Sequence, residues 1–234
     1  MDQQWPGGGS VALDIPVIKL ALGTLSGPLS VRTPITAFAI RHPSGTVLVD
    51  TGIGTPAPSF AARYPAKARS VTDALAEHGI AASDVICIVN SHLHTDHCGE
   101  NSTFDVPAVI QRAELERARI ETPDLSNRFD FPDAKHMLIN GDTELLPGVD
   151  VLHTPGHTIG HQSVLVRGLR TVLIAGDAAY TADIFGRGAA AFRPGVRELQ
   201  IHTNEKMWNA TLDRLRGYAR YVDEVYFAHD GALT

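Results

Sequence analysis

The stretch SHLHTDHCG, residues 91–99, concentrates four potential metal ligands within six residues. These ligands are His92, His94, Asp96 and His97. Three neutral imidazoles and a carboxylate can hold a zinc-like ion, and packing alone rarely requires such groups so close together. The apolar run at residues 85–89 leads directly into the stretch and predicts a buried strand. We therefore expect the ligands on the turn that leaves a strand, where a rigid scaffold presents side chains to a cleft.

Three further ligand candidates each follow a short apolar run that predicts a strand. They are His157 after residues 149–152, Asp177 after residues 171–175, and His229 after residues 225–228. One edge of a sheet can therefore bring all of them together. The seven candidates are five histidines and two aspartates. One zinc site needs three or four protein ligands, so this set predicts two metals that share one carboxylate.

The order of these residues carries a family resemblance. His-x-His-x-Asp-His, followed by a Gly-His, a Gly-Asp and a late His, resembles the metallo-β-lactamase-fold hydrolases, from residues 47–52 to His229. Tyr180, three residues after Asp177, and residues 154–163 are similar to the N-acyl-homoserine lactonases and the related pyridoxolactonases. Glu100 departs from that pattern, because those lactonases have glycine there.

The resemblance implies a fold and a division of the ligands. The expected fold class is α/β, a four-layer αββα sandwich of the metallo-β-lactamase type, in a single domain over residues 1–234. The first metal is expected on His92, His94 and His157, the second on Asp96, His97 and His229, with Asp177 as the bridge. Asp50 is expected to hold the ligand loop in place without binding a metal itself.

The resemblance also implies a reaction and its residues. We expect a metal-bridging hydroxide to attack the carbonyl of a lactone. The expected substrate is an N-acyl-homoserine lactone, which would make the chain a quorum-quenching enzyme. The Tyr180 phenol is expected to donate a hydrogen bond to the carbonyl oxygen, and Asp96 to pass a proton to the leaving alkoxide. Zn²⁺ is the default for nitrogen and oxygen ligands, although cobalt, manganese or iron fit the same set.

Several alternatives stay open at this point. A pyridoxolactonase is one, and a thioester hydrolase resembling hydroxyacylglutathione hydrolase is another, which would need a basic pocket beyond the scattered Arg193 and Arg197. A single-iron dioxygenase of this fold would leave Asp96 and His97 without a role. A β-lactamase, a tRNA-processing nuclease and a non-catalytic binding module fit the ligand set or the net charge less well.

Individual residues also have structural readings. Asp177 could cap a helix that begins at residue 178, and Tyr180 could pack in the core. His153 and His161 flank a ligand, and we expect both to be structural. Cys98 is expected to be a small packed side chain rather than a thiolate ligand.

Composition bounds the class of protein. The chain has 234 residues, 44% of them hydrophobic, and a net charge of −6 without a basic run, which argues against a nucleic-acid partner. Neither a membrane span nor a signal peptide is evident, and two cysteines do not indicate a disulfide framework, so we expect a cytoplasmic protein. A homodimer is an open possibility for its assembly.

The remaining pattern predicts the elements around the ligands. Strands are expected at residues 11–22, 35–40, 46–49, 162–166, 171–174 and 222–228, and helices at residues 70–78, 112–120 and 204–219. Residues 55–69, with three prolines, and the polar residues 121–133 are expected to be loops.

Overall fold

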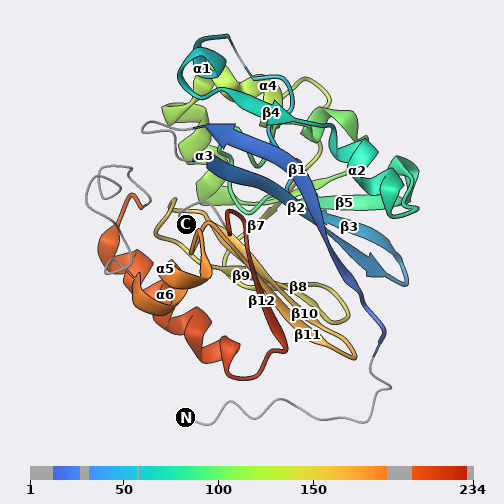
Figure 1. Cartoon of the computed structure of the whole chain (residues 1–234), viewed down its shortest axis with the longest axis vertical. Coiled ribbons are helices and arrows are strands. Elements are labelled where there is room, and N and C mark those ends of the chain that lie inside the picture. Colours follow the sequence, from blue (N-terminus) through green and yellow to red (C-terminus); the bar gives the residue numbers. More distant parts are fainter. Residues whose placement is uncertain (1–12, 27–31, 57, 189–201, 231–234) are drawn as a thin grey trace.

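The computed structural model of the protein describes residues 13–26, 32–56, 58–188 and 202–230. Two β-sheets pack face to face, and helices lie on their outer faces (Figure 1). The predicted four-layer αββα sandwich is therefore confirmed. No helix of the described residues is both long and apolar enough to cross a membrane.

The first sheet has the strand order β4-β1-β2-β3-β5-β6-β7 and the second the order β12-β11-β10-β9-β8. The strands of the first sheet are β1 (Val17–Ser26), β2 (Arg32–His42), β3 (Gly45–Val49), β4 (Ala66–Ala68), β5 (Val85–Val89), β6 (Ala108–Gln111) and β7 (His136–Ile139). Those of the second are β8 (Thr143–Leu146), β9 (Val149–His153), β10 (Gln162–Arg167), β11 (Thr171–Gly176) and β12 (Glu224–Phe227). The helices are α1 (Pro58–Arg63), α2 (Val71–Glu77), α3 (Arg112–Glu121), α4 (Ser126–Phe129), α5 (Ala182–Arg187) and α6 (Glu205–Ala219), with 3₁₀ turns η2 (Ala82–Asp84), η3 (Asn101–Thr103) and η4 (Pro123–Leu125).

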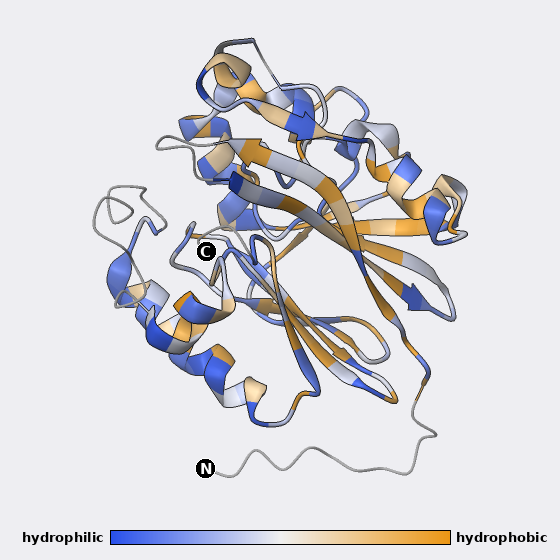
Figure 2. Cartoon of the chain, in the orientation of Figure 1, coloured by the Kyte–Doolittle hydropathy of each residue, from blue (hydrophilic) through white to orange (hydrophobic). Residues whose placement is uncertain are grey.

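Three apolar clusters hold the layers together. Between the sheets, Phe38 and Val89 of the first pack in one cluster with Val151 and Val164 of the second. A second cluster joins helices α2 and α3 to the outer face of the first sheet, and a third joins helices α5 and α6 to the second. Figure 2 shows the same arrangement, with apolar residues along the strands and polar residues on the outer side of helix α6.

The strands bring the ligand loops to one edge of the sandwich. Strands β3, β5 and β6 are parallel neighbours, and so are β11 and β12, so their carboxyl ends lie on the same side within each sheet. Asp50 follows β3, the residue 91–99 stretch follows β5, and Asp177 and His229 follow β11 and β12. Loops at the carboxyl ends of neighbouring parallel strands are where α/β proteins commonly place their sites.

Two predicted loops are wrong. Residues 55–69 contain helix α1, which begins at Pro58, and strand β4, which pairs with β1 through Gly23 and Ala68. Proline suits the first position of a helix, where no backbone N–H is needed, so prolines did not exclude a helix here. Residues 121–133 likewise contain η4 and α4, whose Phe129 is buried in the core.

The other predicted elements agree with the structure. Strand β1 starts directly after Pro16 and extends to Ser26, beyond the predicted end; residues 11 and 12 lie outside the described residues. Helix α2 is capped by Ser70, whose hydroxyl accepts from the backbone N–H of Asp73, and helix α6 is capped in the same way by Asn204.

Candidate metal centre

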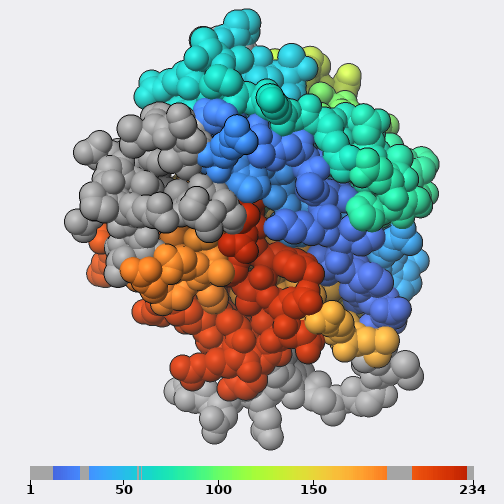
Figure 3. Space-filling view, viewed as in Figure 1, coloured from blue at the N-terminus to red at the C-terminus, as the bar shows by residue number. Residues whose placement is uncertain are grey.

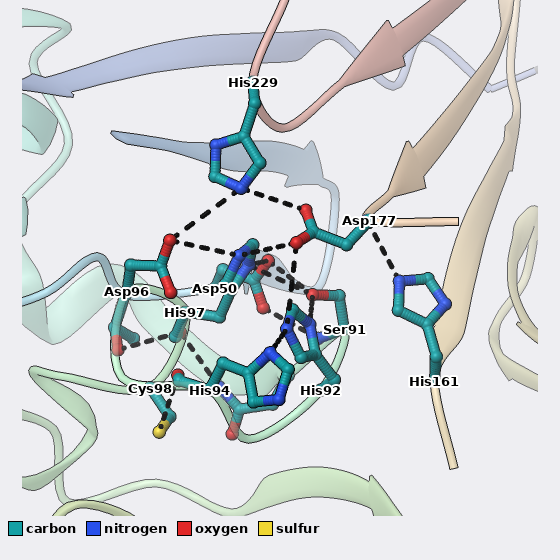
Figure 4. Close-up of polar contacts among 12 residues, drawn as sticks. Asp50, Ser91, His92, His94, Asp96, His97, Cys98, His161, Asp177 and His229 are labelled. Atoms are coloured by element: carbon teal, nitrogen blue, oxygen red, sulfur yellow. Dashed lines mark hydrogen bonds and ion pairs between the residues drawn. The ribbon is translucent and has the colours of Figure 1, made fainter. Parts of the chain in front are cut away.

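The structure brings the seven predicted ligand side chains into one group at this edge, six of them labelled in Figure 4. Their ligand atoms form three overlapping sets, each with all atoms within 4.8 Å of one another. The sets are His92, His94 and His157; His92, His97 and Asp177; and Asp96, His97 and His229. Four of these side chains come from the loop after β5 and three from the second half of the chain.

The first set is a triangle of ring nitrogens. Nε2 of His92 lies 2.9 Å from Nδ1 of His94, and Nε2 of His157 lies 3.1 Å from each of these two nitrogens. Neutral imidazoles cannot satisfy all three contacts as hydrogen bonds, because a ring nitrogen either donates or accepts, and in a triangle at least one side joins two nitrogens of the same kind. Zn–N bonds of ~2.0–2.1 Å are long enough to reach all three corners from a single point.

The set of Asp96, His97 and His229 lies beside the three-histidine set, and Asp177 faces both. Oδ2 of Asp96 is 3.8 Å from Nε2 of both His97 and His229. Oδ2 of Asp177 is 3.5 Å from Nε2 of both His97 and His157, while its Oδ1 is 3.2 Å from Nε2 of His229. Oδ2 thus lies between the two sets and Oδ1 faces His229, so this carboxylate contacts both sets, as a bridging ligand must.

Hydrogen bonds at Nδ1 leave the Nε2 lone pairs of three histidines free to face inward. Nδ1 of His97 lies 2.8 Å from Oδ2 of Asp50, Nδ1 of His229 lies 2.7 Å from the carbonyl oxygen of Pro34, and Nδ1 of His92 lies 3.1 Å from the Ser91 hydroxyl. A carboxylate or carbonyl can only accept, so Nδ1 carries the proton in His97 and His229.

Asp50 supports the ligand loop as expected. Its Oδ1 accepts from the backbone N–H of Ser91 and its Oδ2 from the Ser91 hydroxyl, both over 2.7 Å. Asp50 is also the one non-glycine residue of the described chain with a positive φ, +62°. Such backbone conformations cost free energy and persist where the surrounding contacts enforce them, commonly at functional sites.

The electrostatics of the group favour a bound cation. Nε2 of His97 is buried and has no hydrogen-bond partner among the described residues. Burial opposes a charge on His97 and His229, but the carboxylate of Asp177, together with those nearby, outweighs it and raises the pKa of both rings. Burial also raises the pKa of Asp177, but His229 and His97 outweigh it and lower that pKa below its usual range. The position between these groups therefore attracts positive charge, and the donor set fits a pair of divalent metal ions.

The family model for the metallo-beta-lactamase superfamily matches residues 31–216. The chain belongs to the metallo-β-lactamase superfamily. The predicted family resemblance is thus confirmed.

The relatives that resemble this chain in sequence include N-acyl homoserine lactonases. An N-acyl homoserine lactonase of Bacillus cereus is 33% identical, over 69% of this chain and 70% of the relative. The N-acyl homoserine lactonase AttM of Rhizobium radiobacter is 30% identical, over 84% of this chain and 82% of the relative. A solved N-acyl homoserine lactone hydrolase, with the product N-hexanoyl-L-homoserine at its catalytic metal centre, is 25% identical, covers 95% of each chain and has a TM-score of 0.75.

The ring of Tyr180 lies beside two of the ligand histidines. Its ring centroid is 5.7 Å from that of His157 and 5.0 Å from that of His229, with both pairs edge to face. Burial, with the charges of Asp177 and Asp96, raises the pKa of the phenol well above its usual value. The hydroxyl therefore stays protonated at neutral pH and can serve as a hydrogen-bond donor.

His153, His161 and Cys98 belong to none of the three ligand sets, and each makes a hydrogen bond to the protein. The backbone N–H of Asp177 donates to Nε2 of His161 over 3.0 Å, so His161 holds the central carboxylate in place. His153 contacts the carbonyl oxygen of Ile159 through Nε2. The Cys98 thiol donates to the carbonyl oxygen of His94 and belongs to none of the three ligand sets.

Glu100, the departure from the lactonase pattern, has a structural partner. Its Oε2 accepts from the backbone N–H of Val71, the first residue of helix α2, over 2.8 Å. The first N–H groups of a helix lack partners within it and favour a negative charge. Glu100 therefore fastens the ligand loop to helix α2 and does not enter the metal group.

Three buried side chains that support the site were missed. Arg128 of helix α4 donates to the carbonyl oxygen of Ile53 over 2.6 Å, and Gln162 donates to that of Asn90 over 2.8 Å. Glu114 of helix α3 is 1% exposed and contacts two ligand loops. The sequence showed Glu114 only as one charged residue of a charged, helix-prone segment, and this pattern does not reveal its partners.

Proposed function

We propose that the chain is a metal-dependent lactonase that opens the ring of an N-acyl-homoserine lactone with two divalent metal ions, Zn²⁺ being the first choice. The observation that carries this proposal is the pair of ligand sets joined by Asp177, with the Tyr180 phenol beside both. His92, His94 and His157 would hold one ion and Asp96, His97 and His229 the other.

The relatives support the substrate class. The Bacillus and Rhizobium proteins described above are N-acyl homoserine lactonases, and the aligned part spans 70% and 82% of their lengths. The structural neighbour with a bound product carries N-hexanoyl-L-homoserine, the ring-opened form of such a lactone. A pyridoxolactonase stays an alternative within the same reaction type.

The side chains of this chain have distinct tasks in the proposed reaction. When bound, two divalent ions supply a hydroxide nucleophile at neutral pH and positive charge beside the carbonyl oxygen. Tyr180 is a protonated phenol and donates a hydrogen bond to the carbonyl oxygen as negative charge develops there. Asp96 has the more accessible carboxylate of the centre, 15% exposed against 3% for Asp177, so it is the group placed to take the proton of the attacking hydroxide and pass it to the leaving alkoxide.

The other functions have less support. A single-iron dioxygenase would not use Asp96 and His97, yet both are grouped with His229. A cysteine ligand of the β-lactamase kind is not provided by Cys98. Arg193 and Arg197, considered for a thioester hydrolase, lie outside the described residues. Cytoplasmic location and a homodimer stay predictions.

The test combines metal content with substrate range. Elemental analysis of the active protein as isolated should give two metal ions per chain, and a pH-stat screen should give acid release from homoserine lactones in preference to thioesters and β-lactams. One metal ion per chain in fully active protein, or faster turnover of thioesters than of lactones, would show the proposal to be wrong.

A further inference from the structure

Helix α3 begins beside the centre and places one carboxylate between two ligand loops. Oε1 of Glu114 accepts from the backbone N–H of Leu93 over 2.9 Å, and Oε2 accepts from the backbone N–H of Gly160 over 3.2 Å. Leu93 separates the ligands His92 and His94, and Gly160 lies three residues after the ligand His157. One side chain thus contacts both loops that carry the three-histidine set.

The Glu114 carboxylate is buried and forms an ion pair with Arg117. Glu114 is 1% exposed, and Nη2 of Arg117 donates to its Oε1 over 2.7 Å. Burial raises the pKa of Glu114, but the hydrogen bond and charge of Arg117 outweigh it, so the pKa is lowered and the group is ionised at neutral pH. An ionised carboxylate only accepts hydrogen bonds, and both of its oxygens are needed to satisfy the two backbone N–H groups.

Gly160 shows that the helix and the loop must approach closely. A Cβ built on Gly160 would lie 2.4 Å from both the backbone nitrogen and Cβ of Glu114. These atoms are helix backbone and the base of a side chain, so they cannot move aside cheaply. The distance between helix α3 and the His157 loop is therefore fixed by the absence of a side chain at Gly160.

We infer that Glu114 is a positioning residue that sets the spacing of the three-histidine set by fastening the Leu93 and Gly160 backbones to each other. This inference rests on the proposed metal centre. It concerns mainly the three-histidine position. Among the described residues, the hydrogen bonds of Glu114 reach Leu93, between His92 and His94, and Gly160 in the His157 loop, and none reaches strand β11 before Asp177 or strand β12 before His229. Loss of the carboxylate should therefore weaken one ion selectively.

Two substitutions separate the reach of the side chain from its charge. Glu114→Gln keeps the size but turns one oxygen into an N–H₂ group, which cannot accept from a backbone N–H. Glu114→Asp keeps the charge beside Arg117 but is one carbon shorter, so it cannot span both loops. The control is Glu121→Gln, which removes the other carboxylate that Arg117 contacts; its side chain is 55% exposed and lies at the far end of the helix.

The experiment is a Zn²⁺ titration of metal-free protein against a chromophoric chelator, with thermal melts to check folding. Each Glu114 variant is also made with His229→Ala, which leaves the three-histidine set, and with His94→Ala, which leaves the other set. We expect both Glu114 variants to weaken Zn²⁺ binding about 10- to 100-fold in the His229→Ala background, the range typical for groups that support ligands. In the His94→Ala background, and in Glu121→Gln, binding should stay within about 3-fold of the matching parent.

Each outcome has a defined meaning. Unchanged affinity in both Glu114 variants, or equal losses in both backgrounds, would overturn the positioning role while leaving the proposed function intact. Wild-type protein that binds no Zn²⁺ would instead overturn the proposed centre and this inference with it. If Glu114→Gln does not fold, Glu114→Asp decides, because it keeps the ion pair with Arg117 and removes only the reach.

Discussion

Nδ1 of His97 lies 2.8 Å from Oδ2 of Asp50, and this contact determines which nitrogen of His97 faces the metal group. With its proton on Nδ1, the ring turns the lone pair of Nε2 towards Asp96 and Asp177. Asp50 stands at the end of β3 and His97 in the loop after β5, so two parallel strands together fix the orientation of one ligand. Partners of this kind tune a metal ligand without touching the metal.

Asp50→Asn should lower both metal retention and turnover by about 10- to 100-fold, the usual range for groups that orient a ligand. The amide has one accepting oxygen for three donors: the backbone N–H and hydroxyl of Ser91 and Nδ1 of His97. Metal content and steady-state hydrolysis measure the effect, with Asp105→Asn, whose side chain is 89% exposed, as the control. Full activity and full metal content in Asp50→Asn would contradict the orienting role.

Asp177→Asn should reduce the metal content below two ions per chain and lower turnover, because a neutral amide no longer compensates the charge between two cations. Asp183→Asn is the matched control, since that carboxylate is 55% exposed and pairs with Arg187 of its own helix. Elemental analysis after gel filtration measures the effect. Equal behaviour of the two variants would mean that Asp177 is not the bridge.

Tyr180→Phe should lower the catalytic constant about 10- to 100-fold and leave both metals bound. The loss of one oxyanion donor costs roughly 10²–10³ in rate in other enzymes, and a metal would share the load here, so a smaller effect is expected. The measurement is steady-state hydrolysis of a homoserine lactone, in which kcat rather than KM should fall. Tyr221→Phe, at a residue that is 76% exposed, should leave the rate unchanged; unchanged kinetics in Tyr180→Phe would assign that ring to packing.

The two cysteines should not react with a thiol reagent in the native protein at pH 8. Both are buried and free of disulfides, and burial raises the pKa of Cys87 to about 11 and that of Cys98 further. The reactive form is the thiolate, which is scarce well below the pKa. Titration with Ellman's reagent should give close to no reactive thiol in the folded protein and two in denaturant; rapid reaction of the native protein would contradict the burial of Cys98 beside the ligands.

The ligands could be found from the sequence because each has a local signal. Each follows a strand or lies in a loop directly after one, and strands declare themselves by short apolar runs such as residues 85–89. Each apolar run placed a ligand just beyond the end of a strand, which predicted that one edge could gather them, and the family resemblance predicted how they divide into two sets.

The supporting residues could not be found in this way, because their roles depend on partners far along the chain. Glu114 contacts Gly160 across 46 residues and Arg128 contacts Ile53 across 75. A charged residue in an amphipathic helix has the same local pattern whether it faces solvent or a ligand loop. Strand β4 was missed for a similar reason, since its three residues become a strand only by pairing with β1.

The hydrogen bond between Nδ1 of His229 and the carbonyl oxygen of Pro34 has a consequence for how the protein folds during synthesis. The two residues are 195 positions apart, and Figure 3 shows the C-terminal part of the chain lying against the N-terminal strands. A ribosome still making the last strand has released six of the seven ligands, but the seventh has not yet reached its carbonyl partner. Since domains form their long-range contacts as units, the set that contains His229 is complete only once this residue has reached Pro34 of strand β2.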